Sequence, residues 1–209
     1  SGSNVSFGGV TIGTWAGGSG GTNLVITFNA SATPAAAQAL VRNITYQNTD
    51  TDAPTTGART VRYVLTDGDG GTSANHDTTV TVSGVNDAPV LSFGEGDKNF
   101  TEGALAVMID TLPNISDVDS TVFDTGTLTI TISANPSVND RVELLNAGMG
   151  AGQIGVSGTN VYYGGTLIGT QGGGIGAAPF VVTFNANADA SVAGAVMANI
   201  RFWVAGAAP

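Results

Sequence analysis

The most constraining feature of the sequence is a long internal repeat. Residues 1–48 return as residues 157–204 at a fixed offset of 156 positions, without a gap and with 22 identities in 48 positions. The identities fall in short blocks, such as Thr27–Ala30 against Thr183–Ala186. Because 156 residues is far longer than a solenoid repeat, each unit is predicted to be a whole domain with its own core.

The linker-like segment Val85–Pro89 sets the predicted boundary between two repeats. Residues 1–86 are predicted to be the C-terminal part of one repeat, and residues 87–209 the N-terminal part of the next. Two explanations for the partial repeats stay open. Either the flanks of a longer protein complete both units, or neighbouring copies supply the missing strands in a filament.

Composition and charge narrow the function classes. The chain has 6 Lys and Arg against 16 Asp and Glu, a formal net charge of -10, so it repels nucleic acid and anionic membranes and attracts divalent cations. No apolar run approaches the roughly 18 residues of a membrane span. The chain contains 0 Cys, which excludes disulfides and thiolate metal sites. We therefore expect a secreted protein, not inserted in a membrane, that Ca²⁺ rather than disulfides stiffens.

Periodicity of two residues indicates an all-β fold. Segments 60–65, 79–82 and 127–132 alternate Thr or Arg with apolar residues, as half-buried strands do. Segments 24–28 and 180–184 are more continuously apolar, which is typical of core strands. The 31 Gly are concentrated in connectors between these segments. The pattern predicts a β-sandwich.

One short helix per repeat interrupts the strands. Thr33 is a candidate N-cap, Pro34 occupies the first helical position, and Asp189 is the cap in the second copy. Apolar residues then recur at i, i+3, i+4 and i+7 in both copies: Ala37, Leu40, Val41 and Ile44, and Ala193, Val196, Met197 and Ile200. We interpret each helix as a lid over one end of the sandwich; the alternative is a cofactor site.

Acidic residues gather where strands are predicted to end. They form pairs in loops and in the linker: Asp50 and Asp52, Asp67 and Asp69, Asn86 and Asp87, and Asp117 and Asp119. Calcium takes six to eight oxygen ligands from carboxylates, Asn side chains and backbone carbonyls, so such pairs are natural calcium ligands. The alternative is that they are solvated turn residues, since Asp, Asn and Gly favour turns for backbone reasons.

The acidic motifs and the linker together resemble a known family. The segments that carry the resemblance are Leu65–Gly71, Val85–Val90, Phe100–Gly103 and Ser116–Asp119. As a set, they are similar to the cadherin-like tandem repeats of very large bacterial surface proteins and adhesins. The resemblance implies tandem immunoglobulin- or cadherin-like Greek-key sandwiches. The chain departs from this family in its longer unit, and we interpret the glycine-rich segments Asn4–Gly21 and Asn160–Gly176 as an insertion that forms an extra hairpin.

The resemblance also implies calcium at the junctions between domains. Asn86 and Asp87 match the linker motif of the family, and Asp117 and Asp119 match its D-x-D loop about 30 residues further on. Glu102 resembles the early glutamate that serves the following junction.

Two further aspartate pairs also have counterparts in the family. Asp67 and Asp69 are expected at the opposite end of the first unit, serving a preceding junction. Asp50 and Asp52 occupy the place of the acidic loop between the fifth and sixth strands, but they depart from the usual Asp-Arg-Glu.

The sequence and the resemblance together predict a non-enzymatic structural or adhesive repeat of a bacterial extracellular protein. Calcium at the junctions rigidifies it, so that it acts as an extender or as a biofilm matrix or filament component whose partners are neighbouring repeats. Catalysis is not expected. His76 is the only histidine and lies in a polar run without a catalytic motif, and Glu95, Glu102 and Glu143 give no sign of a paired-carboxylate cleft.

The alternative function is a polysaccharide-binding module of a secreted protein. Aromatic side chains can stack on sugar rings, and the candidates are Trp15, Tyr162, Tyr163 and Trp203. The repeat does not preserve them as a platform, because Gln171 stands at the place of Trp15 in the second copy.

Overall fold

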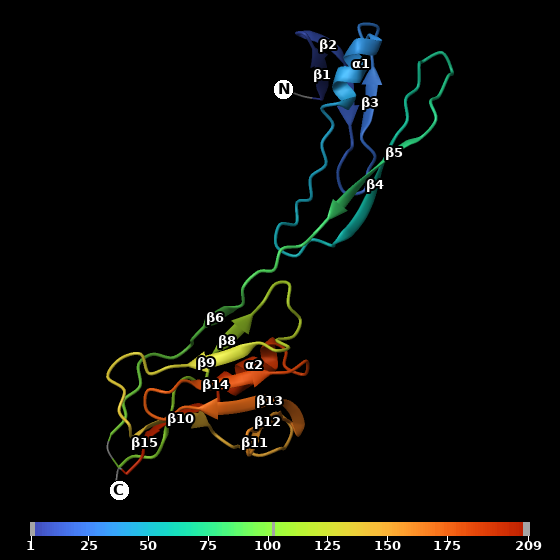
Figure 1. The fold of residues 1–209 in the computed structure, drawn as a ribbon. Helices are drawn as coiled ribbons and strands as arrows, with labels where there is room; N and C mark the ends of the chain where they lie inside the picture. Colours follow the sequence, from blue (N-terminus) through green and yellow to red (C-terminus); the bar gives the residue numbers. More distant parts are fainter. Residues whose placement is uncertain (1–2, 102, 207–209) are drawn as a thin grey trace. The chain divides into compact units, whose positions relative to one another are not determined.

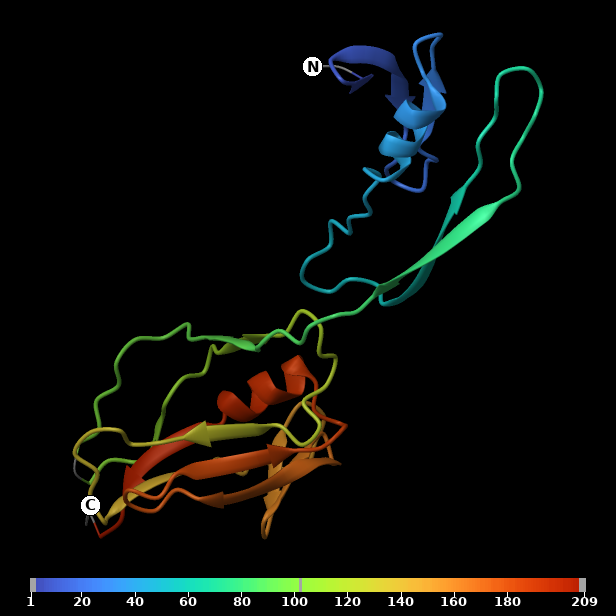
Figure 2. The ribbon, with the colours of Figure 1, turned by 45° about the horizontal axis from the view of Figure 1, so that its top comes forward.

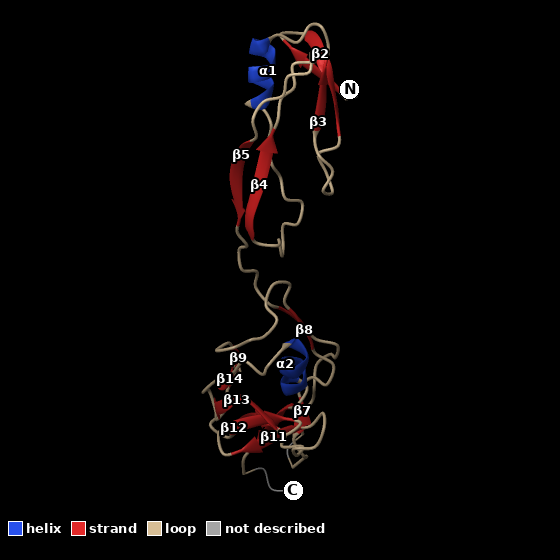
Figure 3. Ribbon diagram, turned by 90° about the vertical axis from the view of Figure 1, so that its right-hand side faces the viewer, coloured by secondary structure: helices blue, strands red, loops and turns tan. Residues whose placement is uncertain are grey.

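Antiparallel strands dominate the structure. The computed structural model describes residues 3–101 and 103–206. Contacts divide the chain into two compact units, one of Ser1–Thr51 and Ala58–Thr81 and the other of Asp52–Gly57 and Val82–Pro209. The described residues form several antiparallel sheets and two short helices, which confirms the prediction of an all-β chain at this level (Figure 1 and Figure 3). Neither helix in this described part of the chain is long and apolar enough to cross a membrane.

The first unit contains a three-stranded sheet, one helix and most of a separate hairpin. The sheet has the order β1-β2-β3, and the hairpin pairs β4 with β5. The elements are β1 (Asn4–Phe7), β2 (Val10–Ala16), β3 (Val25–Phe28), α1 (Pro34–Val41), β4 (Gly57–Tyr63) and β5 (His76–Val82). The predicted strand 60–65 ends earlier than expected, since β4 stops at Tyr63. The two residues that follow, Val64 and Leu65, are half exposed.

The second unit contains three sheets and one helix. The sheet orders are β11-β12-β13-β14-β9, β10-β15-β7 and β6-β8. The elements are β6 (Val90–Ser92), β7 (Val107–Met108), β8 (Asn114–Ser116), β9 (Thr127–Ile130), β10 (Asp140–Leu144), β11 (Ile154–Ser157), β12 (Asn160–Tyr163), β13 (Thr166–Gly173), β14 (Phe180–Phe184), α2 (Ala190–Met197) and β15 (Ile200–Val204). Figure 2 shows α2 between the β6–β8 pair and the five-stranded sheet.

The core of the second unit joins its two larger sheets and its helix. One cluster of buried apolar side chains combines Val142 of β10, Ile154 of β11, Val182 of β14 and Val196 of α2. Ile200 of β15 belongs to the same cluster. Burying such side chains stabilises the fold by about 1.5–3 kcal/mol each, so this cluster holds the sheets and α2 together.

The internal repeat is reproduced in the backbone pairing. In the first copy Asn4 is opposite Thr14 and Gly13 is opposite Phe28, and the residues 156 positions later are paired in the same way. Each copy also has a register shift at the same place, after Val5 and after Val161. The predicted hairpins are thus present, as β1–β2 and β12–β13.

The two helices begin as predicted. Thr33 Oγ1 accepts from the backbone N–H of Ala36 at 3.2 Å, and Asp189 Oδ1 accepts from that of Val192 at 2.8 Å. Each side chain therefore satisfies one of the free N–H groups at the helix start. The second helix is shorter than predicted. It ends at Met197, and Ile200, the last residue of the predicted apolar face, is the first residue of β15.

Candidate metal site beside the linker

The β6–β8 ladder determines where the linker and the D-x-D loop lie. The pairing is antiparallel, with Val90 opposite Ser116. The start of one strand and the end of its partner therefore lie at the same end of the ladder. Asp87 precedes β6 and Asp117 follows β8, so both belong to this end.

Two hydrogen bonds order the linker. The backbone N–H of Asp87 donates to Oδ2 of Asp119 at 3.1 Å, joining residues that are 32 positions apart. The side-chain Nδ2 of Asn86 donates to the carbonyl oxygen of Asp87 at 2.7 Å. One hydrogen bond thus joins the linker to the D-x-D loop, and the other lies within the linker.

Three carboxylate residues line one open hollow of the second unit. They are Asp52, which precedes β4, Asp87 of the linker and Asp117 of the loop after β8. The remaining lining residues are Ala88, Val90, Ser116 and Val118. Carboxylates gathered in a concave site create a negative potential that concentrates cations.

The side chain of Asp117 is fixed by its own turn. Its Oδ1 accepts from the backbone N–H groups of Ser120 at 2.8 Å and of Asp119 at 3.2 Å. The hydrogen bond from Ser120 holds the pKa of Asp117 below its ordinary value, the bond from Asp119 acts in the same direction, and burial opposes both. Asp117 is therefore an ionised carboxylate at neutral pH.

The carboxylates of the hollow do not converge on a single point. Among residues 3–101 and 103–206, no three or more His, Cys, Asp or Glu side chains are grouped closely enough to hold a metal ion. The donors that line the hollow are nevertheless oxygen atoms, the type that calcium requires.

Asp67 and Asp69 lie in the first unit, in the loop between β4 and β5. Oδ1 of Asp67 accepts from the backbone N–H groups of Asp69 and Gly71, each at 2.9 Å. The bond from Asp69 is the main cause that lowers the pKa of Asp67, with Gly71 adding to it. Within this loop, Asp67 therefore closes its own turn through its side chain, as Asp residues commonly do in turns.

Asp50 is not among the residues that line the hollow. Asp50 belongs to the first unit, and its backbone N–H donates to Oδ1 of Asn48 at 3.0 Å. Glu102 lies outside the residues that the structure describes.

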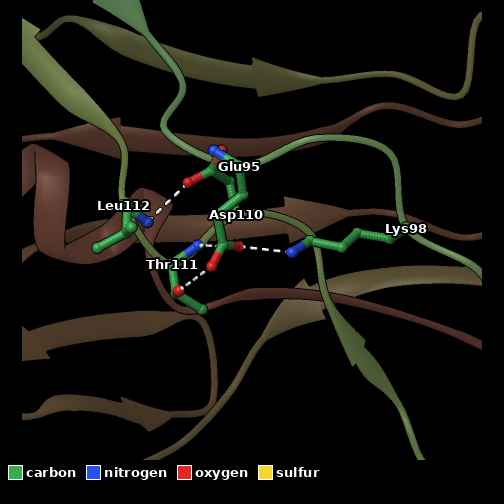
Figure 4. A network of polar contacts seen from close by, with 5 residues as sticks. All are labelled: Glu95, Lys98, Asp110, Thr111 and Leu112. Atoms are coloured by element: carbon green, nitrogen blue, oxygen red, sulfur yellow. Dashed lines mark hydrogen bonds and ion pairs between the residues drawn. The ribbon is translucent and has the colours of Figure 1, made fainter.

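A second acidic cluster, which the sequence reasoning missed, lies within the second unit (Figure 4). Glu95 Oε1 accepts from Thr111 Oγ1 at 2.7 Å, and Oε2 accepts from Lys98 Nζ at 2.6 Å and from the Thr111 N–H at 3.1 Å. The buried carboxylate of Asp110 accepts from the backbone N–H groups of Glu95 at 3.2 Å and of Leu112 at 2.7 Å.

These contacts lower the pKa of Glu95 to about 2, mainly through Lys98 and then through the two hydrogen bonds from Thr111. The hydrogen bonds of the two carboxylates connect the segment after β6 with the segment after β7. The only sequence signal for it was Asp110 two residues before Leu112-Pro113, a turn pattern.

The candidate residues for polysaccharide binding and for catalysis lie on different strands. Trp15 is on β2 and 45 % exposed, whereas Trp203 is on β15, where the guanidinium carbon of Arg141 is 5.9 Å from its ring centroid. His76 begins β5, next to Asp77, whose carboxylate pairs with Arg62 at 2.7 Å. Comparison of the chain with protein-family models, curated proteins and solved structures finds no match.

Proposed function

We propose that the chain is a non-enzymatic, calcium-stiffened repeat of a bacterial extracellular protein, acting as an extender or as a component of a matrix or filament. The repeats are proposed to be Greek-key sandwiches of the cadherin-like type. The observation that carries the proposal is the hollow lined by Asp52, Asp87 and Asp117. These residues come from three separate stretches of chain, so a ligand shared among them connects the segment before β4 with the linker and with the loop after β8.

The three side chains of the hollow differ in what they contribute. Asp117 is held ionised by its turn, so it presents a fixed negative charge. Asp87 sits in the linker itself, and its backbone is tied to Asp119. Asp52 comes from the segment before β4. A bound calcium ion neutralises such charges and, with its preference for six to eight oxygens, draws the carboxylates together.

Composition supports the extracellular, mechanical part of the proposal. A net charge of -10 concentrates divalent cations at the surface, and a chain with 0 Cys has no disulfides to stiffen it. Under this proposal, metal occupancy replaces covalent cross-links as the source of rigidity in the linker.

A calorimetric titration tests the proposal. Calcium is added to the whole 209-residue chain and compared with magnesium, which demands a tighter octahedral shell. We expect calcium to bind, magnesium to bind more weakly, and Asp117→Asn to weaken calcium binding about tenfold or more. The matched control is Asp124→Asn, an exposed aspartate of the same unit outside the hollow. Equal affinities for Asp117→Asn and Asp124→Asn contradict the proposed site.

A further inference from the structure

We propose that Asp69, followed by Gly70, is a site of spontaneous isoaspartate formation, and that the fold protects Asp67, followed by Gly68, from the same reaction. The two sites lie at the tip of the β4–β5 hairpin in the first unit. Asp-Gly occurs in the sequence at these two places alone. The proposal concerns a chemical modification of the chain itself and is independent of calcium.

The reaction uses a backbone nitrogen, a protonated carboxyl group and water. The nitrogen of the residue after Asp bonds to the side-chain carboxyl carbon, whose C–O bond breaks, and the hydroxyl group leaves with the amide proton as water. The product is a cyclic succinimide. Water then adds to either ring carbonyl: addition at the side-chain carbonyl restores Asp, and addition at the main-chain carbonyl gives isoaspartate. No oxidant or reductant is needed, and the mass of the chain is unchanged.

The attacking nitrogens of the two sites are alike. Gly68 and Gly70 both have positive φ angles, of 87° and 101°, and open space surrounds the Cβ position of each. Neither residue has a side chain that hinders ring closure. Neither backbone N–H donates a hydrogen bond to residues 3–101 or 103–206. A difference in reactivity therefore comes from the two carboxyl groups.

The carboxylate of Asp67 is held by the turn. Its Oδ1 accepts from the backbone N–H groups of Asp69 and Gly71, and the backbone N–H of Asp67 donates to the carbonyl oxygen of Gly71 at 3.2 Å. These side-chain hydrogen bonds lower the pKa of Asp67, which reduces the protonated form that reacts. Ring closure would also replace an ionised acceptor by a neutral imide oxygen, a weaker partner for both N–H groups.

The carboxylate of Asp69 is not held in this way. The residue is exposed, and within the described part of the chain its side chain accepts no hydrogen bond. Its backbone N–H already donates to Asp67, so the turn fixes the main chain of Asp69 but leaves the carboxyl group able to rotate toward the nitrogen of Gly70. The structure thus separates two sites of identical local sequence into a reactive one and a protected one.

Isotope labelling of the unaltered chain tests the proposal. The 209-residue chain is kept in heavy-oxygen water with EDTA at about pH 5, where some carboxyl groups are protonated. Each passage through a succinimide leaves heavy oxygen on that residue, whether Asp or isoaspartate forms. Cleavage after Arg62 and Lys98 releases a peptide that contains both sites. Fragmentation mass spectrometry then measures the label on each residue and identifies isoaspartate.

In the folded chain we expect about tenfold or more label on Asp69 than on Asp67, the factor contributed by one hydrogen bond to a charged group. In urea, where the turn is lost, we expect both residues to be labelled to a comparable extent. Equal labelling in the folded chain, or a preference for Asp69 that persists in urea, overturns the protective role of the turn. Absence of label on Asp69 by the time the unfolded chain is labelled overturns the reactive site.

A matched pair of variants tests the attacking nitrogen. A methyl group on the attacking residue hinders ring closure, so Gly70→Ala is expected to reduce the label on Asp69. Gly68→Ala is the control, because both glycines have positive φ and Ala introduces similar backbone strain at each. It is expected to leave the label on Asp69 unchanged. Equal label on Asp69 in the two variants contradicts attack by the nitrogen of Gly70.

Discussion

Asp87 and Asp119 are joined by a hydrogen bond of 3.1 Å from the backbone N–H of the linker residue to the carboxylate of the loop residue. The bond connects the chain before β6 with the turn after β8. It depends on the antiparallel β6–β8 ladder, which places both residues at one end. The linker is thereby ordered by the same loop that contributes Asp117 to the hollow.

Loss of this bond should expose the linker amide. In Asp119→Ala we expect the Asp87 N–H to exchange with solvent about two- to tenfold faster, matching the net contribution of one hydrogen bond of about 0.5–1.5 kcal/mol. Amide exchange followed by NMR measures the rate. The control is Asp124→Ala, which removes an exposed aspartate from the same unit. Unchanged exchange in Asp119→Ala argues against a linker ordered by the loop.

The depressed pKa of Glu95 predicts an acid-sensitive second unit. The ordinary value is 4.5 and the folded value is about 2, so the contribution of Glu95 is complete above pH 4.5 and is lost as the pH falls toward 2. Glu95→Gln should therefore lower the melting temperature at pH 7, with a smaller deficit near pH 2.5. Calorimetry at both pH values provides the measurement.

Asp97→Asn is the control for this effect, as it changes an exposed neighbouring carboxylate. A Glu95→Gln deficit that stays constant between pH 7 and pH 2.5 contradicts the role assigned to Lys98 and Thr111 in stabilising the ionised carboxylate.

Two glycines of the second unit should respond in opposite directions to alanine. A Cβ on Gly169 would lie 2.1 Å from the carbonyl oxygen of Thr183, because β13 and β14 approach closely there, so Gly169→Ala should destabilise the unit by about 1–3 kcal/mol. Gly194 lies within α2 with open space around its Cβ position.

Gly194→Ala should therefore stabilise the unit by about 0.5–1 kcal/mol. Urea unfolding of both variants measures these differences. A Gly169→Ala chain as stable as the unaltered chain contradicts the tight β13–β14 contact, and a destabilised Gly194→Ala chain contradicts the open space around the Gly194 Cβ position.

The internal repeat and the residue periodicity predicted the elements that form between residues close together in the sequence. The β1–β2 and β12–β13 hairpins and the capped helices follow from local residue patterns and turn glycines. The sequence did not predict strands that form only by pairing with a segment far away along the chain. Ile44 and Ile200 occupy the same repeat position, yet only Ile200 begins a strand, because β15 lies between β10 and β7.

Part of the candidate site was likewise predicted from local motifs, and part was missed. The linker and the D-x-D loop were named from motifs, and Asp87 and Asp119 are in fact in contact. The Glu95–Asp110 cluster was missed, because its donors are backbone N–H groups and side chains brought together by two loops, which no local spacing encodes.

Small-angle scattering of the whole chain, with saturating calcium and then with EDTA, tests the central claim most directly. We expect EDTA to broaden the distribution of interdomain distances, and the Asp117→Asn chain to scatter in calcium as the unaltered chain does in EDTA. Superimposable profiles with and without calcium, for a chain that remains folded, contradict a linker stiffened by metal.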